Sequence, residues 1–435
     1  MDIRPGDKVK VICKDDEFYD GLFIDKKKDT TVIKSVTGYN IGILNSTIKE
    51  VKLLEKGKDL KISHAKKHEP KPGLPTISIL HTGGTIASKV DYRTGAVVAS
   101  FNPEDLIGMF PELLDIANID SRLIGNMFSD DMRFLHYSLM AKAIQEEVEK
   151  GAEGIILTQG TDTLGYTAAA LSFMLESIPV PVLIVGAQRS SDRGSSDAAM
   201  NLLCAAEFIR KSDFAGVAVC MHELSSDDSC AIMPGCKTRK LHTSRRDAFQ
   251  AVNDSPVARV NFKTRKVEML KGGYLKKDRK RDWFPKDKME EKVAILKIHT
   301  NMSADQFRFF KGYRGLVIEG TGLGHAPINM TEHTPMHDDN KKAIKELVDS
   351  GCVVVMTSQC LFGRTQMDVY STGRDLQEIG VIPGEDMLPE TAFIKLAWLL
   401  ANEPADVKTL LRQDLRGEIN PSIGKDDFLD DPSGK

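Results

Sequence analysis

Two short segments combine hydroxyl and carboxylate side chains with glycine, and each follows an apolar run. The first spans residues 81–88 and contains Thr85, and the second spans residues 159–163 and contains Thr161 and Asp162. In open parallel sheets ligands bind at the carboxyl ends of strands, where glycine lets the backbone approach a bound molecule. Together the two segments predict one cleft that holds threonine hydroxyls and a carboxylate.

Such a cleft suits nucleophilic acyl transfer by a threonine. The hydroxyl is a poor nucleophile at neutral pH and needs a base within hydrogen-bonding reach. His81 is the one histidine in these segments, and it falls at the end of the strand. A partly buried lysine beside a carboxylate is an alternative base, and Lys240 is a candidate. Spacing alone does not distinguish it from an ordinary solvated lysine.

Each pattern has a plainer interpretation. The glycines of the first segment fit a tight turn or a phosphate cradle, and Thr161 and Asp162 fit a helix N-cap. A zinc site is a further possibility around His222 and three cysteines, but the gaps fit no standard tetrahedral pattern. The cysteines of that group are Cys220, Cys230 and Cys236.

The elements expected around these segments indicate an α/β protein. From residue 76 to about 270, apolar runs alternate with longer helical periods, which predicts a doubly wound, mostly parallel sheet covered on both faces. A second α/β block is expected over 293–415. Residues 1–63 alternate short β-branched runs with turn signals, which predicts about five strands curled into a small β-barrel.

The segments between these domains are polar. Residues 64–75 contain prolines and glycine and are expected to form a linker, and residues 271–292 carry nine basic and five acidic side chains. We expect 271–292 to be a solvated interdomain connector, with local RNA contacts as the alternative. Residues 416–435 are expected to form a solvated tail.

Length and composition exclude several classes of protein. The 435 residues exceed one typical domain, and 41% hydrophobic residues with a net charge of −3 exclude a disordered or globally basic chain. No run approaches the length of a membrane span, and the polar N-terminus lacks a secretory signal, so a cytoplasmic location is expected. Seven cysteines without a CxxC pair make a disulfide framework improbable.

Residues 76 to 404 resemble the bacterial-type L-asparaginase/glutaminase family. The segments around Thr85 and Thr161 match the two family signatures, which together are specific. Further matches lie at 129–132, 185–189, 195–197, 247–249 and 358–360, with Gly363.

The resemblance implies a mechanism in two steps. By position, it assigns the nucleophile to Thr85 and the family's lysine to Lys240, and it gives assisting roles to Thr161 and Asp162. Thr85 would attack a side-chain carboxamide, expel ammonia and form an acyl-threonine ester that water hydrolyses. No metal or organic cofactor is expected for this step.

The resemblance also implies the substrate contacts. Tyr92 matches a loop that closes over the substrate, Ser129 would hold its α-carboxylate, and Asp162 would face its α-ammonium. Asp130 stands where some members carry glutamine. The remaining expected contacts are Gly84, Gly160 and Ala187.

The N-terminal domain is unnecessary for a free-standing asparaginase. A barrel followed by an asparaginase-like unit resembles an archaeal family of tRNA-dependent amidotransferase subunits. This implies a glutaminase that delivers ammonia to a partner subunit of the GatE type, which uses ATP and magnesium to convert Glu-tRNA(Gln) to Gln-tRNA(Gln). A homodimer within a heterotetramer is also implied.

Two other functions compete with this one. The first is a stand-alone L-asparaginase with an accessory domain, and the second is an RNA-binding scaffold with an inactive amidase site. The net charge opposes a dominant phosphate-binding face. His325 stands where homotetrameric asparaginases often place an asparagine that reaches a neighbouring subunit, so we expect it to be a core or loop histidine instead.

Overall fold

The N-terminal residues form a curled antiparallel sheet. The computed structural model describes residues 3–4, 6–35, 40–56, 70–83, 88–90, 97–99, 109–189, 195–424 and 428. The strands run in the order β4-β3-β2-β1-β5. They are β1 (Lys8–Cys13), β2 (Phe18–Lys26), β3 (Thr30–Ser35), β4 (Asn40–Leu44) and β5 (Ile48–Glu55).

The curl of this sheet has local causes. The β2–β3 register shifts between Phe23 and Asp25, and a bulge of this kind bends a strand. A Cβ at Gly21 would lie 2.3 Å from the Lys34 carbonyl oxygen, so glycine permits the close approach. Within residues 6–35 and 40–56 no ladder joins β4 to β5. Five strands are thus present, and closure into a barrel stays a prediction.

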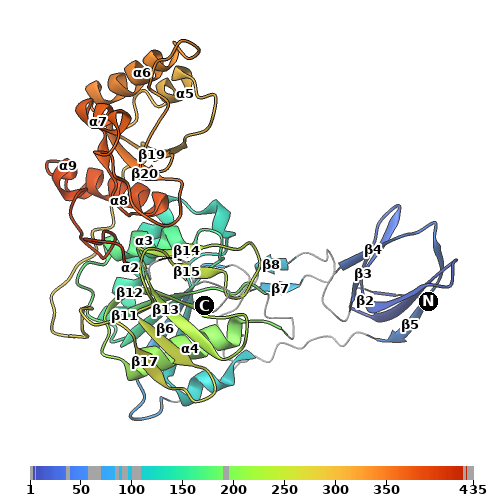
Figure 1. Ribbon diagram of the computed structural model, residues 1–435. Coiled ribbons are helices and arrows are strands. Elements are labelled where there is room, and N and C mark those ends of the chain that lie inside the picture. The colour runs from blue at the N-terminus through green and yellow to red at the C-terminus, as the bar shows by residue number, and fades with distance from the viewer. Residues whose placement is uncertain are drawn as a thin grey trace, which may run out of the picture.

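An eight-stranded sheet forms the centre of the second domain (Figure 1). Its order is β17-β16-β13-β12-β11-β10-β6-β9, and the five strands from β12 to β9 are parallel. These are β6 (Thr76–His81), β9 (Asn118–Leu123), β10 (Gly154–Thr158), β11 (Pro181–Val185) and β12 (Gly216–His222). The antiparallel strands are β13 (Ser229–Pro234), β16 (Ala258–Asn261) and β17 (Val267–Met269).

Helices cover both faces of this sheet. Along β10, Ile155 and Leu157 belong to the core that contains α2 (Phe134–Glu149) and α3 (Leu164–Met174). Ile156 belongs to the opposite core, with α4 (Ala198–Lys211). All three isoleucine and leucine side chains are fully buried, which explains why the strand is apolar throughout. Short elements complete the domain: η2 (Pro111–Asp115), η3 (Ser129–Asp131), and the hairpins β7 (Ser88–Val90) with β8 (Val97–Ala99) and β14 (Thr238–Lys240) with β15 (Phe249–Ala251).

The C-terminal domain is a smaller parallel sheet with helices, drawn in orange and red in Figure 1. Its strands are β18 (Val293–Lys297), β19 (Gly315–Gly320), β20 (Val353–Ser358) and β21 (Ile382–Pro383). Its helices are α5 (Ala304–Arg308), α6 (His337–Asp349), α7 (Ser371–Glu378), α8 (Pro389–Asn402) and α9 (Val407–Leu410). Helix α8 packs on α3 of the preceding domain, with Phe173 and Trp398 rings 5.7 Å apart. Within the described residues no helix is long and apolar enough to cross a bilayer.

The 271–292 connector is bound to the catalytic domain rather than solvated along its length. Its backbone pairs with the segment before β12 through hydrogen bonds such as Lys277 N to Asp213 O, 2.7 Å. The Lys277 ammonium donates to the Ile209 carbonyl at 2.5 Å, and Arg281 donates to the Ile178 carbonyl at 3.3 Å. The expectation of a solvated connector is therefore wrong for these residues, because their charged ends satisfy backbone carbonyls.

The start of the expected tail is also bound. Glu418 is fully buried and Ile419 is 9% exposed, whereas a solvated tail would expose both. The Glu418 carboxylate pairs with the buried Lys395 ammonium at 2.5 Å, which offsets the cost of burying either charge. The chain beyond residue 424, apart from Phe428, lies outside the described residues.

Candidate active site

The two predicted segments leave neighbouring strands of the sheet. Strands β6 and β10 are parallel neighbours, with His81 paired to Thr158. The backbone amide and the hydroxyl of Thr82 both donate to the Thr158 carbonyl at 3.1 Å. The expected shared edge of the sheet is therefore present up to Gly83.

Lys240 lies at this edge beside the second segment. Its ammonium donates to the Thr161 hydroxyl at 2.8 Å and to the Asp162 carboxylate at 2.8 Å. The lysine side chain is 14% exposed and the aspartate side chain is 63% exposed. A shielded amine that contacts both an alcohol and an open carboxylate can take up a proton at the mouth of the site.

The hairpin β14–β15 carries Lys240 to this place. It lies against the first turn of α3, where a Cβ on Gly165 would come within 2.9 Å of the Thr238 carbonyl oxygen. Glycine therefore permits the close contact between the hairpin and the helix. Because Lys240 is 79 residues from Thr161, only this packing brings the two together.

The helix-cap interpretation of Thr161 and Asp162 is wrong. Helix α3 begins at Leu164, its N-cap is Thr163, and no side chain forms a cap hydrogen bond there. The Asp162 carboxylate instead accepts from Lys240. The Thr163 hydroxyl donates to the backbone carbonyl of Ser129 at 2.8 Å.

Ser129 is buried directly beneath the second segment. Its hydroxyl accepts from the Asp162 amide at 3.3 Å. A Cβ at Gly160 would lie 3.0 Å from the Ser129 hydroxyl oxygen, so glycine allows this contact. Asp130 follows on η3 and is exposed. The structure thus brings Ser129 and Gly160 to the Thr161–Asp162 pair.

The turn after β11 supports Thr161 from behind, and sequence reasoning missed this support. A Cβ at Gly186 would lie 2.8 Å from the Thr161 methyl group. The next residue, Ala187, is 1% exposed, and the following two amides donate to the carboxylate of the fully buried Asp197 at 3.0 Å each. The Gly-Ala pair directly after an apolar strand was the available signal.

Thr85, Gly84 and Tyr92 lie outside the described residues. The described chain reaches Gly83, which has φ +102°. A Cβ at Gly83 would lie 2.6 Å from the Met127 carbonyl oxygen, so both backbone conformation and space favour glycine there.

A hollow of about 230 Å³ adjoins Lys240. Asp162 and Tyr166 line it from the catalytic domain, and Leu388 and Glu390 line it from the start of α8. Burial raises the pKa of Tyr166 to about 12, so its hydroxyl stays protonated at neutral pH. Both domains therefore contribute to the surroundings of the lysine.

His81 does not supply the missing base. It is fully buried, and its ring nitrogens bond the Thr158 hydroxyl at 2.8 Å and the Ser121 hydroxyl at 2.9 Å. Burial lowers the pKa of His81 to about 4, so the ring is neutral at neutral pH. Its role is to join the ends of three adjacent strands.

This histidine should make the protein acid-sensitive. Protonation favours the unfolded chain, because the pKa of His81 is about 4 when folded and 6.5 for the unperturbed group. Its stabilising contribution is complete above about pH 6.5 and is lost as the pH falls toward 4, a change of about 3 kcal/mol. Urea unfolding of wild type and His81→Gln across this range checks it. Parallel stability curves would contradict the assignment.

The other candidates are structural. Cys220 and Cys230 lie in a different core cluster from Cys236, and among the described residues no group of three ligands suits a metal ion. His222 bonds the Asn201 side chain at 2.7 Å. His325 is half-buried in a loop with its ring 5.4 Å from that of Tyr370, and burial lowers its pKa.

Family models match three parts of the chain. "Asparaginase, N-terminal" covers residues 76–272, "Glutaminase/Asparaginase C-terminal domain" covers 292–411, and "GatD N-terminal domain" covers 3–54. A Pyrococcus furiosus protein, named as the GatD subunit of glutamyl-tRNA(Gln) amidotransferase, is 47% identical over 98% of this chain and 97% of that protein. The chain belongs to the GatD family of glutamyl-tRNA(Gln) amidotransferase subunits.

Other members and more distant structures agree with this assignment. The GatD protein of Methanococcus maripaludis strain C7 is 45% identical, over 97% of this chain and 99% of that protein. The L-asparaginase of Thermococcus kodakarensis is 29% identical with a TM-score of 0.69, and covers 80% of this chain and all of its own. The L-asparaginase I of Vibrio cholerae is 27% identical with a TM-score of 0.68, over 80% of this chain and 99% of its own. The asparaginase-like two-domain α/β fold with an added N-terminal β-rich region is thus confirmed.

Proposed function

We propose that this GatD family member is the glutaminase component of a tRNA-dependent amidotransferase. The contact of the Lys240 amine with Thr161 and Asp162 carries the proposal, because it supplies the base that a threonine nucleophile needs. The similarity to GatD proteins over 98% of the chain supports the wider assignment.

The proposed reaction is two-step acyl transfer. Thr85 Oγ bonds to the side-chain carbonyl carbon of glutamine as its proton passes through Thr161 to the Lys240 amine. The carbon–nitrogen bond then breaks, ammonia leaves with a proton, and a γ-glutamyl ester remains on Thr85. Water hydrolyses the ester to glutamate and regenerates the threonine. Backbone amides near Thr161 would stabilise the oxyanion.

The substrate's amino-acid end would lie over the second segment. Ser129 and the adjoining Gly160 would receive the α-carboxylate, while the exposed Asp162 carboxylate would face the α-ammonium. Because Asp162 also accepts from Lys240, one group links substrate recognition to the proton acceptor. The other proposed contacts are Tyr92, Gly84, Asp130 and Ala187.

We propose that this step needs no cofactor of its own. A lysine, a carboxylate and backbone amides suffice for amide hydrolysis through a threonine ester. ATP and magnesium would be used by a GatE-type partner, which activates the γ-carboxylate of Glu-tRNA(Gln). The chain would work in the cytoplasm, as a homodimer that carries two partner chains.

Ammonia transfer explains why hydrolysis should depend on the partner. Free ammonia becomes ammonium in water and is no longer a nucleophile, so release into solvent would waste the reaction. The isolated chain should therefore hydrolyse glutamine slowly, and addition of the partner and Glu-tRNA(Gln) should raise the rate.

A glutaminase assay with each component omitted in turn tests this prediction. Full activity of the single chain, equal to that of the complex, would contradict partner-dependent hydrolysis. Assaying asparagine in parallel tests the alternative of a stand-alone L-asparaginase, for which the single chain should hydrolyse asparagine rapidly. That alternative leaves the N-terminal β-rich domain unexplained.

A further inference from the structure

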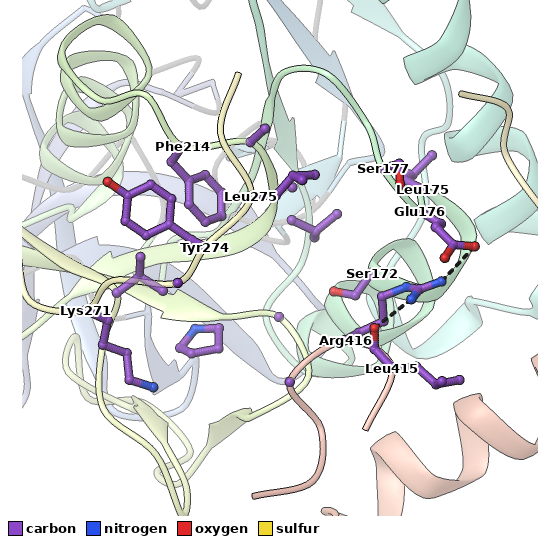
Figure 2. A pocket seen from close by; sticks show the side chains of 18 of the residues that line it. Ser172, Leu175, Glu176, Ser177, Phe214, Lys271, Tyr274, Leu275, Leu415 and Arg416 are labelled. Atoms are coloured by element: carbon purple, nitrogen blue, oxygen red, sulfur yellow. Dashed lines mark hydrogen bonds and ion pairs between the residues drawn. The ribbon is translucent and has the colours of Figure 1, made fainter. Parts of the chain in front are cut away.

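The chain after α9 forms a bound segment, Asp414–Asn420, which we call the C-terminal strap. Besides pairing with Lys395, the Glu418 carboxylate accepts from the Leu415 amide at 3.0 Å and from the Arg416 amide at 2.6 Å. The Arg416 side chain pairs with Glu176, next to the end of α3, at 3.0 Å (Figure 2). The strap is therefore anchored to both domains.

The strap also forms one side of a cavity of about 510 Å³. Figure 2 shows Leu415 and Arg416 on one side of it, with Phe214, Tyr274 and Leu275 on the other. Its contacts with the connector across this space are therefore incomplete. The specific polar contacts of the strap, rather than continuous packing, must fix the position of its end.

That end meets a fully buried ion pair between the domains. The Asn420 amide donates to one carboxylate oxygen of Asp386 at 2.9 Å, and the other oxygen pairs with the Lys237 ammonium at 2.5 Å. Both charged side chains are 0% exposed. Lys237 belongs to the catalytic domain and Asp386 to the C-terminal domain, so the pair crosses between them.

Asn253 completes this contact. Its side chain accepts from the Gly363 amide at 2.8 Å and donates to the Gly363 carbonyl at 2.9 Å and the Asp386 carbonyl at 3.2 Å. The Asn420 side-chain amide donates to the Asn253 carbonyl. We call Lys237, Asn253, Asp386 and Asn420 the buried junction.

The buried junction lies at the base of the hairpin that carries Lys240. Lys237 immediately precedes β14, Asn253 follows β15 by one residue, and the Val252 amide donates to the Lys237 carbonyl at 2.8 Å. Lys240 is paired with Phe249 at the other end of this three-residue ladder. A tilt of the base would therefore move the ammonium that contacts Thr161.

We infer that the C-terminal strap and the buried junction are a positioning device for Lys240. A buried ion pair costs desolvation and is rarely the most stable way to fill a core, whereas its directional contacts can fix one orientation. Here they fix the hairpin base against the C-terminal domain. The inference rests on the proposed role of Lys240 as proton acceptor, and it makes Lys237, Asp386 and Asn420 positioning residues.

The test compares two asparagine variants in the full chain with its partner subunit. Asn420→Ala removes the side-chain contact at the junction. Asn340→Ala is the matched control, because Asn340 is a fully buried asparagine on α6 whose side chain donates to the Pro327 carbonyl at 2.9 Å. We expect Asn420→Ala to lower kcat for glutamine about tenfold with KM within about twofold, since small misplacements of a catalytic group slow chemistry. Asn340→Ala should leave both constants near wild type.

A double-mutant cycle separates positioning from general destabilisation. If Asn420 acts through Lys240, Asn420→Ala should have no further effect in a Lys240→Met background, whereas an independent structural effect would add. Equal kcat for Asn420→Ala and Asn340→Ala, or additive losses, would overturn the inference.

Two further results keep the outcomes distinct. If Asn420→Ala does not fold, Lys237→Met with Asp386→Leu removes both buried charges together, and wild-type kcat in that variant would overturn the inference. Undiminished activity of Lys240→Met would refute the proposed proton acceptor itself, which is a different failure.

Discussion

Glutamine hydrolysis by the Thr85→Val chain should fall by roughly 10⁴-fold or more, because valine keeps the shape of threonine but has no oxygen to form the ester. Neither the Thr161 hydroxyl nor the Ser129 hydroxyl would replace it, since each is already engaged at the second segment. Steady-state ammonia release from the complex with its partner measures the effect.

Thr357→Val is the matched control for this prediction. Thr357 is a fully buried threonine on β20 whose hydroxyl donates to the Ile318 carbonyl at 3.3 Å. Its loss removes a similar group from the C-terminal domain, and we expect activity near wild type. Residual hydrolysis in Thr85→Val equal to that of Thr357→Val would refute a nucleophile at position 85.

Lys240→Met should slow the reaction by about 10²- to 10⁴-fold, the usual contribution of a positioned base. Lys240→Arg gives the sharper result. Arginine retains the positive charge near Asp162 but does not give up its proton at working pH. If the amine must accept a proton, the arginine variant should stay close to the methionine variant in kcat.

Lys345→Met provides the control for this pair. Lys345 is an exposed lysine on α6 that pairs with Asp349, and its replacement should leave hydrolysis unchanged. Recovery of near wild-type kcat in Lys240→Arg would show that charge alone suffices. The role of Lys240 would then be electrostatic, and the relay through Thr161 would be wrong.

Local pattern was informative for the sheet and for half of the site. The apolar run 154–158 is buried on both faces as β10, and the polar residues after it face the cleft because a parallel strand ends there. Thr161 and Asp162 were therefore predictable from position. Lys240 was not, because its place depends on the packing of a short hairpin against α3, and residue spacing contains no such information.

Polarity was misleading at the connector and the tail. Residues such as Lys277 and Glu418 look solvated in the sequence, yet each is held by a group far along the chain, the Ile209 carbonyl and the Lys395 ammonium. A charged side chain is buried only when a partner satisfies it, and the partner is known only from the fold. The buried junction was missed for the same reason.

Mapping the covalent intermediate tests the central claim most directly. The complex is mixed with glutamine, quenched in acid during turnover and digested, and the peptides are analysed by mass spectrometry. We predict a glutamyl ester on the peptide that contains residue 85, and none in the Thr85→Val chain. An ester on another residue, or ammonia release at full rate from Thr85→Val, would contradict the mechanism.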